Sequence, residues 1–220
     1  MPVRTVTDRY TGELLPVGKI LCLGRNYIAH AREMKADLPS TPVVFLKPAT
    51  ALLHTGETIV IPPLSHELHY EAEMVVVMGN DGKDIPEARA LSHVYGYAVG
   101  LDMTLRDLQS EAKKNGLPWS VAKGFDTSAP VSEVVTRDRI NDPHSLQLTL
   151  QVNGRTRQNA STGDMIFRIE KVIAFLSQIF TLERGDLIFT GTPEGVGEVK
   201  SGDTLVAELT SVGTLSVSVR

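Results

Sequence analysis

The stretch YEAEMVVV at residues 70–77 sets two glutamates at alternate positions of a strand-like apolar run. Side chains alternate between the faces of a β-strand, so Glu71 and Glu73 point the same way, about 7 Å apart along the backbone. The apolar run continues to Met78 and predicts a strand covered on both faces. Two carboxylates at the mouth of such a strand repel each other and are costly to desolvate, and a divalent cation removes both costs. Taken alone, however, an E-x-E pair is more simply explained as the solvated face of an edge strand.

A third carboxylate, Asp102, follows a second apolar run at residues 94–101 and precedes a predicted helix start at residues 103–109. Strand-to-helix junctions often display functional side chains from a rigid base, although an aspartate there also serves as a helix cap. Three carboxylates without a nearby cysteine form an all-oxygen set, which suits Mg²⁺ or Mn²⁺ and leaves positions for water and substrate. Calcium normally takes more ligands, and zinc favours histidines, which do not stand at suitable spacing on these runs.

Length and composition predict one soluble globular domain. The 220 residues are enough for one substantial core, and 42% hydrophobic with 22% charged residues is ordinary for this class. A net charge of −4 excludes a broad basic surface for nucleic acid or anionic membrane, and the apolar runs are far shorter than a bilayer span. The N-terminus has no hydrophobic signal core, so we expect a cytoplasmic protein. The one cysteine, Cys22, cannot form an internal disulfide, and we expect a buried, inert thiol.

Short strand-like runs dominate the chain, and helical patterns do not alternate regularly with them. We therefore expect a mixed α/β, predominantly β architecture rather than a doubly wound sheet. Asn153-Gly154 between two strand-like runs predicts a two-residue hairpin. An apolar stripe predicts a helix over residues 164–180, with starting caps at residues 161–164. The predicted strands are 19–24, 43–46, 58–61, 70–78, 94–101, 146–152, 186–190, 204–209 and 214–219.

Two residue pairs have the spacing of neighbours on one helix face. His30 and Glu33 are three residues apart, and a carboxylate beside an imidazole orients it and raises its basicity, as in a water-activating general base. Arg106 and Gln109 share this spacing, and Arg106 could bind a substrate carboxylate through two parallel hydrogen bonds. A solvated surface face is the alternative for both pairs.

A lysine and a glycine-rich loop complete the set of candidate groups. Lys123 lies among largely apolar residues, where its charge could neutralise an oxyanion, although most lysines are solvated. The loop GTPEGVG at residues 191–197 lacks the Lys-Ser/Thr ending and the βαβ context of a nucleotide-binding loop. Its better use is a tight turn that presents backbone N–H groups and the Thr192 hydroxyl to a carboxylate, with a plain turn as the alternative.

Together these motifs resemble the fumarylacetoacetate hydrolase family, and within it the short single-domain branch of acylpyruvases and oxaloacetate-handling enzymes. The resemblance covers residues 17–220 in matching order. It is carried by GRNY at 24–27 followed by His30 and Glu33, FLKP at 45–48, HYEAE at 69–73, DMTLRDLQ at 102–109, WSVAKGFD at 119–126 and GTPEGVG at 191–197. It implies the β-roll of that family's C-terminal domain with a few packed helices, usually as a homodimer. Residues 1–16 would then be a short N-terminal extension packed on a single catalytic domain, residues 17–220.

Carried over residue by residue, the resemblance implies a complete site. The metal ligands for Mg²⁺ or Mn²⁺ would be Glu71, Glu73 and Asp102. The catalytic residues would be His30, Glu33 and Lys123. The substrate-binding residues would be Arg25, Arg106, Gln109, Gly191 and Thr192.

The resemblance also implies a small-molecule substrate, a 2-oxo acid that bears an acyl or carboxyl group on the neighbouring carbon. With the charge on the 2-oxo oxygen stabilised by the metal, three outcomes share one enolate. Hydrolysis of acylpyruvates such as acetylpyruvate and fumarylpyruvate is the first, and oxaloacetate tautomerisation or decarboxylation is the second. A 2-hydroxyhepta-2,4-diene-1,7-dioate isomerase is a more distant third. The alternative from another class is a non-catalytic module with a structural cation, which would need neither the His30–Glu33 pair nor Lys123.

Overall fold

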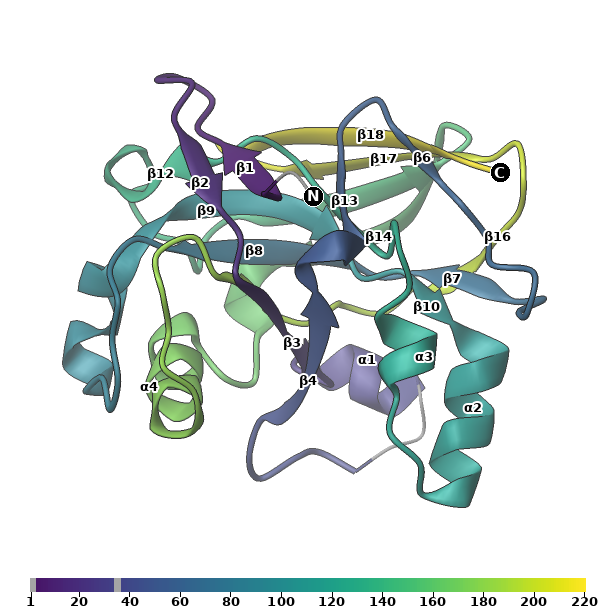
Figure 1. Ribbon diagram of the computed structural model, residues 1–220, viewed down its shortest axis with the longest axis horizontal. Coiled ribbons are helices and arrows are strands. Elements are labelled where there is room, and N and C mark those ends of the chain that lie inside the picture. Colours follow the sequence, from purple (N-terminus) through teal and green to yellow (C-terminus); the bar gives the residue numbers. More distant parts are fainter. Residues whose placement is uncertain (1–2, 34–36) are drawn as a thin grey trace.

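The computed structural model describes residues 3–33 and 37–220 and is predominantly β, as expected (Figure 1). Its largest sheet has the strand order β4-β3-β15-β8-β9-β11-β5, with β12 beside β9. The long central strands are β8 (Ala72–Met78) and β9 (Val94–Leu101), which pair antiparallel. The other members are β3 (Lys19–Gly24), β4 (Val43–Pro48), β5 (Leu52–His54), β11 (Ala129–Val131), β12 (Val135–Thr136) and β15 (Leu187–Phe189).

A second, five-stranded sheet packs on one face of the first, lying above β8 and β9 in Figure 1. Its order is β14-β13-β17-β18-β6, formed by β6 (Thr58–Ile59), β13 (Gln147–Val152), β14 (Arg155–Ser161), β17 (Thr204–Leu209) and β18 (Gly213–Val219). Between β13 and β14, Asn153 and Gly154 have φ angles of 50° and 75°. Two positive φ angles are what a two-residue type I′ hairpin requires, so the predicted hairpin is confirmed.

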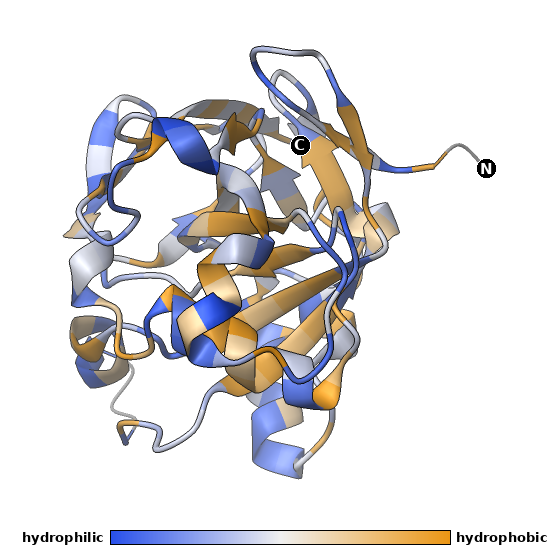
Figure 2. Ribbon diagram, turned by 90° about the vertical axis from the view of Figure 1, so that its left-hand side faces the viewer, coloured by the Kyte–Doolittle hydropathy of each residue, from blue (hydrophilic) through white to orange (hydrophobic). Residues whose placement is uncertain are grey.

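The core has two layers because β8 is apolar on both faces. Met74 and Val76 pack toward the five-stranded sheet, whereas Val75 and Val77 contribute to a second cluster on the opposite face. The N-terminal hairpin of β1 (Thr5–Thr7) and β2 (Leu14–Pro16) adds Val6 to that second cluster. Figure 2 shows hydrophobic strands inside and hydrophilic loops at the periphery. The prediction of a strand covered on both faces is confirmed, and so is the burial of Cys22.

The strand predicted over residues 70–78 is divided at Glu71. Its first part is β7 (Leu68–Tyr70), the centre of a small sheet with β10 (Thr104–Leu105) and β16 (Gly197–Val199), and its second part is β8. Because the two parts pair with different sheets, Glu71 lies where the chain passes from one to the other. The helices α1 (Ile28–Glu33), α2 (Arg106–Asn115) and α3 (Ser120–Lys123) lie in the lower right of Figure 1, and α2 packs against α3.

The prediction of a helix over residues 164–180 is wrong at its start, because α4 spans Ile169–Ile179. Residues 162–164 form a 3-10 turn, and Met165 and Arg168, on either side of a bend at residues 166 and 167, have extended backbones. Asn26 explains the late start. Its backbone carbonyl accepts the Ile166 N–H at 2.8 Å, and its side-chain Oδ1 accepts the Phe167 N–H at 2.7 Å. These bonds direct the N–H groups of the predicted first turn toward another segment of the chain.

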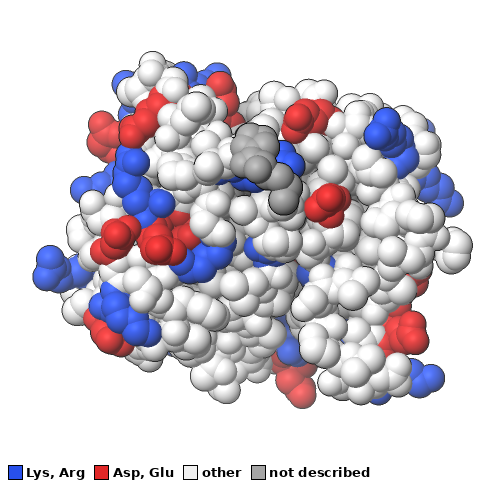
Figure 3. All heavy atoms as spheres, viewed as in Figure 1, with Lys and Arg blue, Asp and Glu red and all other residues white. Residues whose placement is uncertain are grey.

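The face of the molecule that Figure 3 displays has no single dominant charge. Figure 3 shows Lys and Arg side chains interspersed with Asp and Glu side chains over the face that it displays. Within residues 3–33 and 37–220, no helix is both long enough and apolar enough to cross a membrane.

Candidate metal centre and pocket

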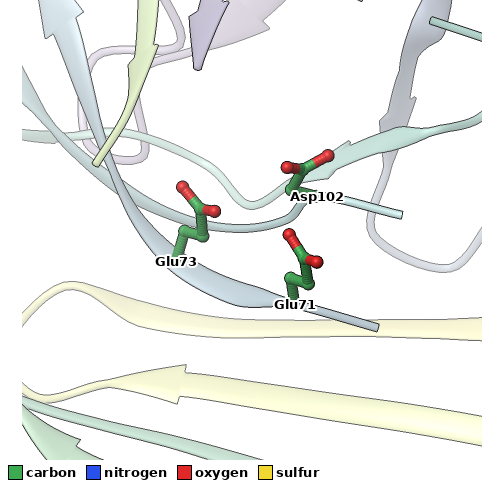
Figure 4. A group of neighbouring side chains, drawn as sticks. All are labelled: Glu71, Glu73 and Asp102. Atoms are coloured by element: carbon green, nitrogen blue, oxygen red, sulfur yellow. The ribbon is translucent and has the colours of Figure 1, made fainter. Parts of the chain in front are cut away.

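Glu71, Glu73 and Asp102 converge on one point. The pairing of β8 with β9 sets Ala72 opposite Leu101, and the Asp102 N–H donates to the Glu71 carbonyl at 2.8 Å. One carboxylate oxygen from each acid lies within 4.8 Å of the other two, and all three side chains are buried. Figure 4 shows the carboxylates pointing toward one another. The expectation that both glutamates face the same side is confirmed, and Asp102 joins them from the neighbouring strand end.

Two oxygens of this cluster lack a hydrogen-bond partner among the described residues. They are Glu73 Oε1 and Asp102 Oδ1, both fully buried. Lys47 Nζ lies 2.8 Å from Asp102 Oδ1 but outside hydrogen-bonding geometry, so that contact is an ion pair only. Buried carboxylate oxygens are normally hydrogen-bonded, and exceptions call for an explanation. Orphan oxygens on two converging acids fit a hard divalent cation such as Mg²⁺ or Mn²⁺.

Two cations bind the opposite side of the cluster. Lys123 Nζ lies 2.8 Å from Glu71 Oε2 and 2.6 Å from Asp102 Oδ2, and Arg106 Nη2 lies 2.6 Å from Glu71 Oε1. Burial alone would raise the pKa of Glu71, but the charges of Lys123 and Arg106 hold that pKa well below its ordinary value. Burial likewise acts to lower the pKa of Lys123, and the charges of Asp102 and Glu71 outweigh it and raise that pKa. Glu71 and Lys123 are therefore ionised at neutral pH.

Glu73 has the opposite electrostatic environment. Burial, followed by repulsion from Asp102 and Glu71, raises its pKa well above the ordinary value, although the Gly191 N–H donates to its Oε2 at 2.7 Å. A carboxylate must lose its proton to bind a metal. The ionised form of Glu73 is therefore the one that gains most from a cation in this cluster.

His30 and Glu33 meet on α1, as their spacing predicted. His30 Nδ1 lies 3.3 Å from Glu33 Oε2, and the Glu33 carboxylate accepts the Gly195 N–H at 3.1 and 3.3 Å. Gly195 has a φ angle of +91°, and a Cβ atom there would lie 2.2 Å from the Arg157 carbonyl oxygen, so only glycine fits. The imidazole, 5% exposed, is thus oriented by a carboxylate that the C-terminal loop holds in place.

A cavity of about 290 Å³ brings most of the predicted residues together. Its wall consists of Leu23, Gly24, Arg25, His30, Phe45, Glu71, Arg106, Gln109, Lys113, Trp119, Lys123 and Thr192. Four predicted residues are not part of this wall: Glu33, Glu73, Asp102 and Gly191. Glu33 contacts the wall residue His30, Asp102 and Glu73 lie beside the wall residue Glu71, and Gly191 donates to Glu73. Gly191 therefore holds a predicted metal ligand, which differs from the substrate contact that the resemblance implied for it.

Arg106 has three protein partners. Its Nη2 binds Glu71, its Nη1 donates to Gln109 Oε1 at 2.6 Å, and its Nε donates to His69 Nδ1 at 3.3 Å. These bonds use three of the five N–H donors of the guanidinium group, and Arg106 also lines the cavity, so its contact with a substrate carboxylate stays a prediction. Arg106 neutralises Glu71 and fixes the Gln109 amide.

Two supporting residues escaped the sequence-based prediction. Lys47 is fully buried on β4 and donates to the Met103 carbonyl at 3.1 Å. Its position in a largely apolar strand could have indicated that this lysine is buried. Gln158 donates to Thr192 Oγ1 at 2.8 Å and accepts the Ala72 N–H at 2.9 Å, so it holds the C-terminal loop against β8. Its neighbours on β14 are mostly polar, and nothing in that pattern marks it as buried.

Comparison with known proteins agrees with this geometry. Residues 19–220 match the fumarylacetoacetate (FAA) hydrolase C-terminal family. The chain is 49% identical over 200 residues to the mitochondrial oxaloacetate tautomerase FAHD1 of Homo sapiens, covering 91% of this chain and 90% of that protein. It is 48% identical over 201 residues to the Arabidopsis thaliana protein of the same name, covering 91% and 90%.

Solved structures give the same result. The fumarylpyruvate hydrolase from Pseudomonas aeruginosa in complex with Mn²⁺ and pyruvate has a TM-score of 0.95 at 40% identity, over 100% of this chain and 97% of that chain. The 5-carboxymethyl-2-hydroxymuconate delta-isomerase from Mycobacterium smegmatis has a TM-score of 0.83 at 38% identity, over 94% and 81%. The chain therefore belongs to the fumarylacetoacetate hydrolase family.

Proposed function

We propose that this chain is a Mg²⁺- or Mn²⁺-dependent enzyme that acts on 2-oxo acids through an enolate. One observation carries the proposal: the cluster with orphan oxygens on Glu73 and Asp102 adjoins the cavity into which the Glu33-oriented His30 faces. A divalent cation held by Glu71, Glu73 and Asp102 would withdraw electrons from the 2-oxo group and stabilise the enolate. A structural cation site would need neither the oriented imidazole nor the cavity.

The chain's own residues divide the remaining work. His30, with Glu33 on its Nδ1, accepts a proton from water or from a substrate carbon, and the Glu33 carboxylate stabilises the imidazolium that results. Lys123 lies in the cavity wall with Nζ 4.9 Å from the centre of the Phe45 ring, where it can stabilise negative charge on the substrate. Trp119 and Phe45 keep that side of the cavity apolar.

The first candidate reaction is the hydrolysis of acylpyruvates. Water, deprotonated by His30, adds to the distal carbonyl carbon, and the bond between that carbon and C3 breaks. The electron pair of that bond becomes the enolate of pyruvate, which then takes up a proton. The products are pyruvate and a carboxylic acid, and atoms and charge balance without an oxidant or reductant.

The second candidate is oxaloacetate tautomerisation, in which His30 moves a proton at C3 and no water is consumed. The names of the FAHD1 relatives favour it, whereas the name of the Pseudomonas structure favours hydrolysis. Oxaloacetate decarboxylation would share the same enolate, and a dioate isomerase reaction is the more distant alternative. The assignment of the individual site residues belongs to this proposal.

A substrate panel tests the proposal. Purified protein loaded with Mg²⁺ or Mn²⁺ is mixed with acetylpyruvate, fumarylpyruvate and both oxaloacetate tautomers, and loss of the ultraviolet absorbance of the enol is followed. We expect turnover that stops when the metal is stripped and returns when it is restored. Metal-loaded protein that is inert on all four compounds would indicate a cation-binding module instead.

We also propose that the chain is a homodimer and that it is cytoplasmic. An apolar groove between β4 and residues 117–120 supports the dimer, with Leu46 and Leu117 exposed at 44% and 57%. Light scattering should give twice the 24.0 kDa mass of one chain. The FAHD1 relatives are named as mitochondrial, so imaging of the tagged protein in its own cell is needed to distinguish a cytoplasmic from a mitochondrial location.

A further inference from the structure

Four cations line the cavity, and they divide into two kinds. Arg106 and Lys123 are paired with Glu71, at 2.6 and 2.8 Å. Arg25 and Lys113 line the same cavity, and neither has a carboxylate at salt-bridge distance within the part of the chain that the structure describes. The cavity wall therefore contains two positive charges that its own single acid, Glu71, does not neutralise.

Lys113 is an exposed residue of this wall. It follows Arg106 by seven residues and Gln109 by four on α2, so all three side chains share one helix face, and all three line the cavity. Lys113 Nζ lies 5.1 Å from the centre of the Trp119 ring. Trp119 also lines the cavity, so this contact holds the ammonium beside the cavity wall.

Arg25 reaches the cavity from the turn between β3 and α1. Its φ angle is +59°, the left-handed region that costs an ordinary residue about 1–2 kcal/mol. Its neighbour Asn26 anchors the turn, because its buried amide donates to the Phe167 and Thr190 carbonyls at 3.0 and 2.7 Å. A strained backbone that is held firmly and directs a cation into a cavity is typical of a functional position.

Taking the proposed function as given, we infer that Lys113 and Arg25 form a subsite for a second carboxylate, so that the substrates are 2-oxo diacids. The metal cluster would take the 2-oxo acid end, and the apolar walls of Phe45 and Trp119 would flank the middle of the molecule. Lys113 is then a specificity-determining residue that selects a diacid over an acylpyruvate with a neutral acyl group. Oxaloacetate and fumarylpyruvate both carry this second carboxylate, at different distances from the 2-oxo group.

The test compares ligands that differ in that carboxylate. Mn²⁺-loaded protein is titrated with pyruvate, oxaloacetate and fumarylpyruvate, and binding is followed by the fluorescence of Trp119, the one tryptophan in the chain. Lys113→Met keeps the length of the side chain and removes its charge, and Arg25→Gln removes the second charge. Lys114→Met is the matched control, since Lys113 and Lys114 are both exposed on the same helix and carry the same charge, but Lys113 is the one that lines the cavity.

We expect Lys113→Met to weaken the binding of a diacid by about 10- to 100-fold, the usual value of a hydrogen bond between charged groups. Pyruvate binding should change less than about threefold, and Lys114→Met should change neither. If Lys113→Met weakens the binding of fumarylpyruvate but not of oxaloacetate, the subsite is supported, and it lies at the distance of the second carboxylate of the longer diacid. An equal loss for pyruvate and both diacids would overturn it, because Lys113 would then act only through general attraction of anions.

This readout separates the inference from the proposed function. If the wild-type protein turns over none of the substrates but binds diacids in a Lys113-dependent way, the subsite holds and the reaction is wrong. If turnover is robust and the ratio of diacid to pyruvate affinity is the same in Lys113→Met as in wild type, the enzyme assignment holds and the subsite is wrong. Turnover of fumarylpyruvate relative to acetylpyruvate in the same variants gives a second measure of the same selectivity.

Discussion

Glu73→Gln separates the metal requirement of the cluster from its packing. Glutamine keeps the size of the side chain, and its amide oxygen can still accept the Gly191 N–H that now binds Glu73 Oε2 at 2.7 Å. The amide nitrogen would take the place of Oε1, the buried oxygen that lacks a partner among the described residues. The substitution also removes a charge that Asp102 and Glu71 repel. We therefore expect the metal-free variant to be at least as stable as the metal-free wild type.

With Mn²⁺ bound, the wild type should be more stable than Glu73→Gln. A ligand at a hundred times its Kd stabilises the folded state by about 2.7 kcal/mol. For a chain of 220 residues, 1 kcal/mol shifts the Tm by about 2–4 °C, so the wild-type Tm should rise by about 5–11 °C. Breaking a buried charge pair costs about 3–5 kcal/mol, which corresponds to a hundredfold or greater loss of affinity. At the same Mn²⁺ concentration the variant would retain about 0.4 kcal/mol, a shift of about 1–2 °C.

Thermal unfolding with and without Mn²⁺ measures both quantities, and Glu198→Gln on the exposed end of β16 is the control for loss of one negative charge. The pH dependence gives an independent check. Since the folded state keeps the Glu73 proton to a higher pH than the unfolded chain, this group makes metal-free wild type lose stability as the pH rises above the ordinary value of 4.5. Glu73→Gln should lack that loss. A full wild-type Mn²⁺ shift in Glu73→Gln would refute the assignment of this cluster as the metal site.

Three further substitutions test the remaining roles. His30→Ala should reduce acylpyruvate hydrolysis by about 10²- to 10⁴-fold and oxaloacetate decarboxylation much less, since only hydrolysis needs an activated water. If the ratio of the two activities is unchanged at equal metal content, His30 is not the water-activating base. Lys47→Met breaks a buried ion pair with Asp102 and should lower the free energy of unfolding by about 3 kcal/mol, measured by urea titration. The control Lys200→Met replaces a lysine that is 74% exposed and should change this free energy by less than about 0.5 kcal/mol. Asn26→Ala removes three buried hydrogen bonds and should lower the free energy of unfolding by about 3 kcal/mol. Its control is Asn80→Ala, which removes one exposed hydrogen bond at 3.2 Å. An equal loss of stability in a variant and its control would contradict the buried contacts of Lys47 or Asn26.

Local pattern was sufficient for most of the strands and for the two glutamates of the acidic cluster. The runs predicted at 19–24, 94–101 and 204–209 coincide with β3, β9 and β17, because each alternates or is uniformly apolar over the length of one strand. The alternation that sets Glu71 and Glu73 on one side is a property of the extended backbone itself. The same holds for His30 and Glu33, whose contact follows from the pitch of a single helical turn.

Contacts between distant segments decided the rest. The apolar stripe at 164–180 has helical periodicity throughout, yet Asn26 draws residues 166 and 167 out of the helix from about 140 positions away. Arg106 had the spacing of a free, pocket-facing cation, and only the folded chain shows that Glu71 occupies it.

The sequence by itself determined which neighbours share a strand or helix face, because those relations depend only on backbone geometry over a few residues. The tertiary structure decided which charges are neutralised and which remain available. Arg106 and Lys113 lie on the same face of α2, but Glu71 lies against the first, whereas the Trp119 ring lies against the second. Coulomb interactions act through space, so the partner of each charge is set by the packing of strands and loops that are far apart in the chain.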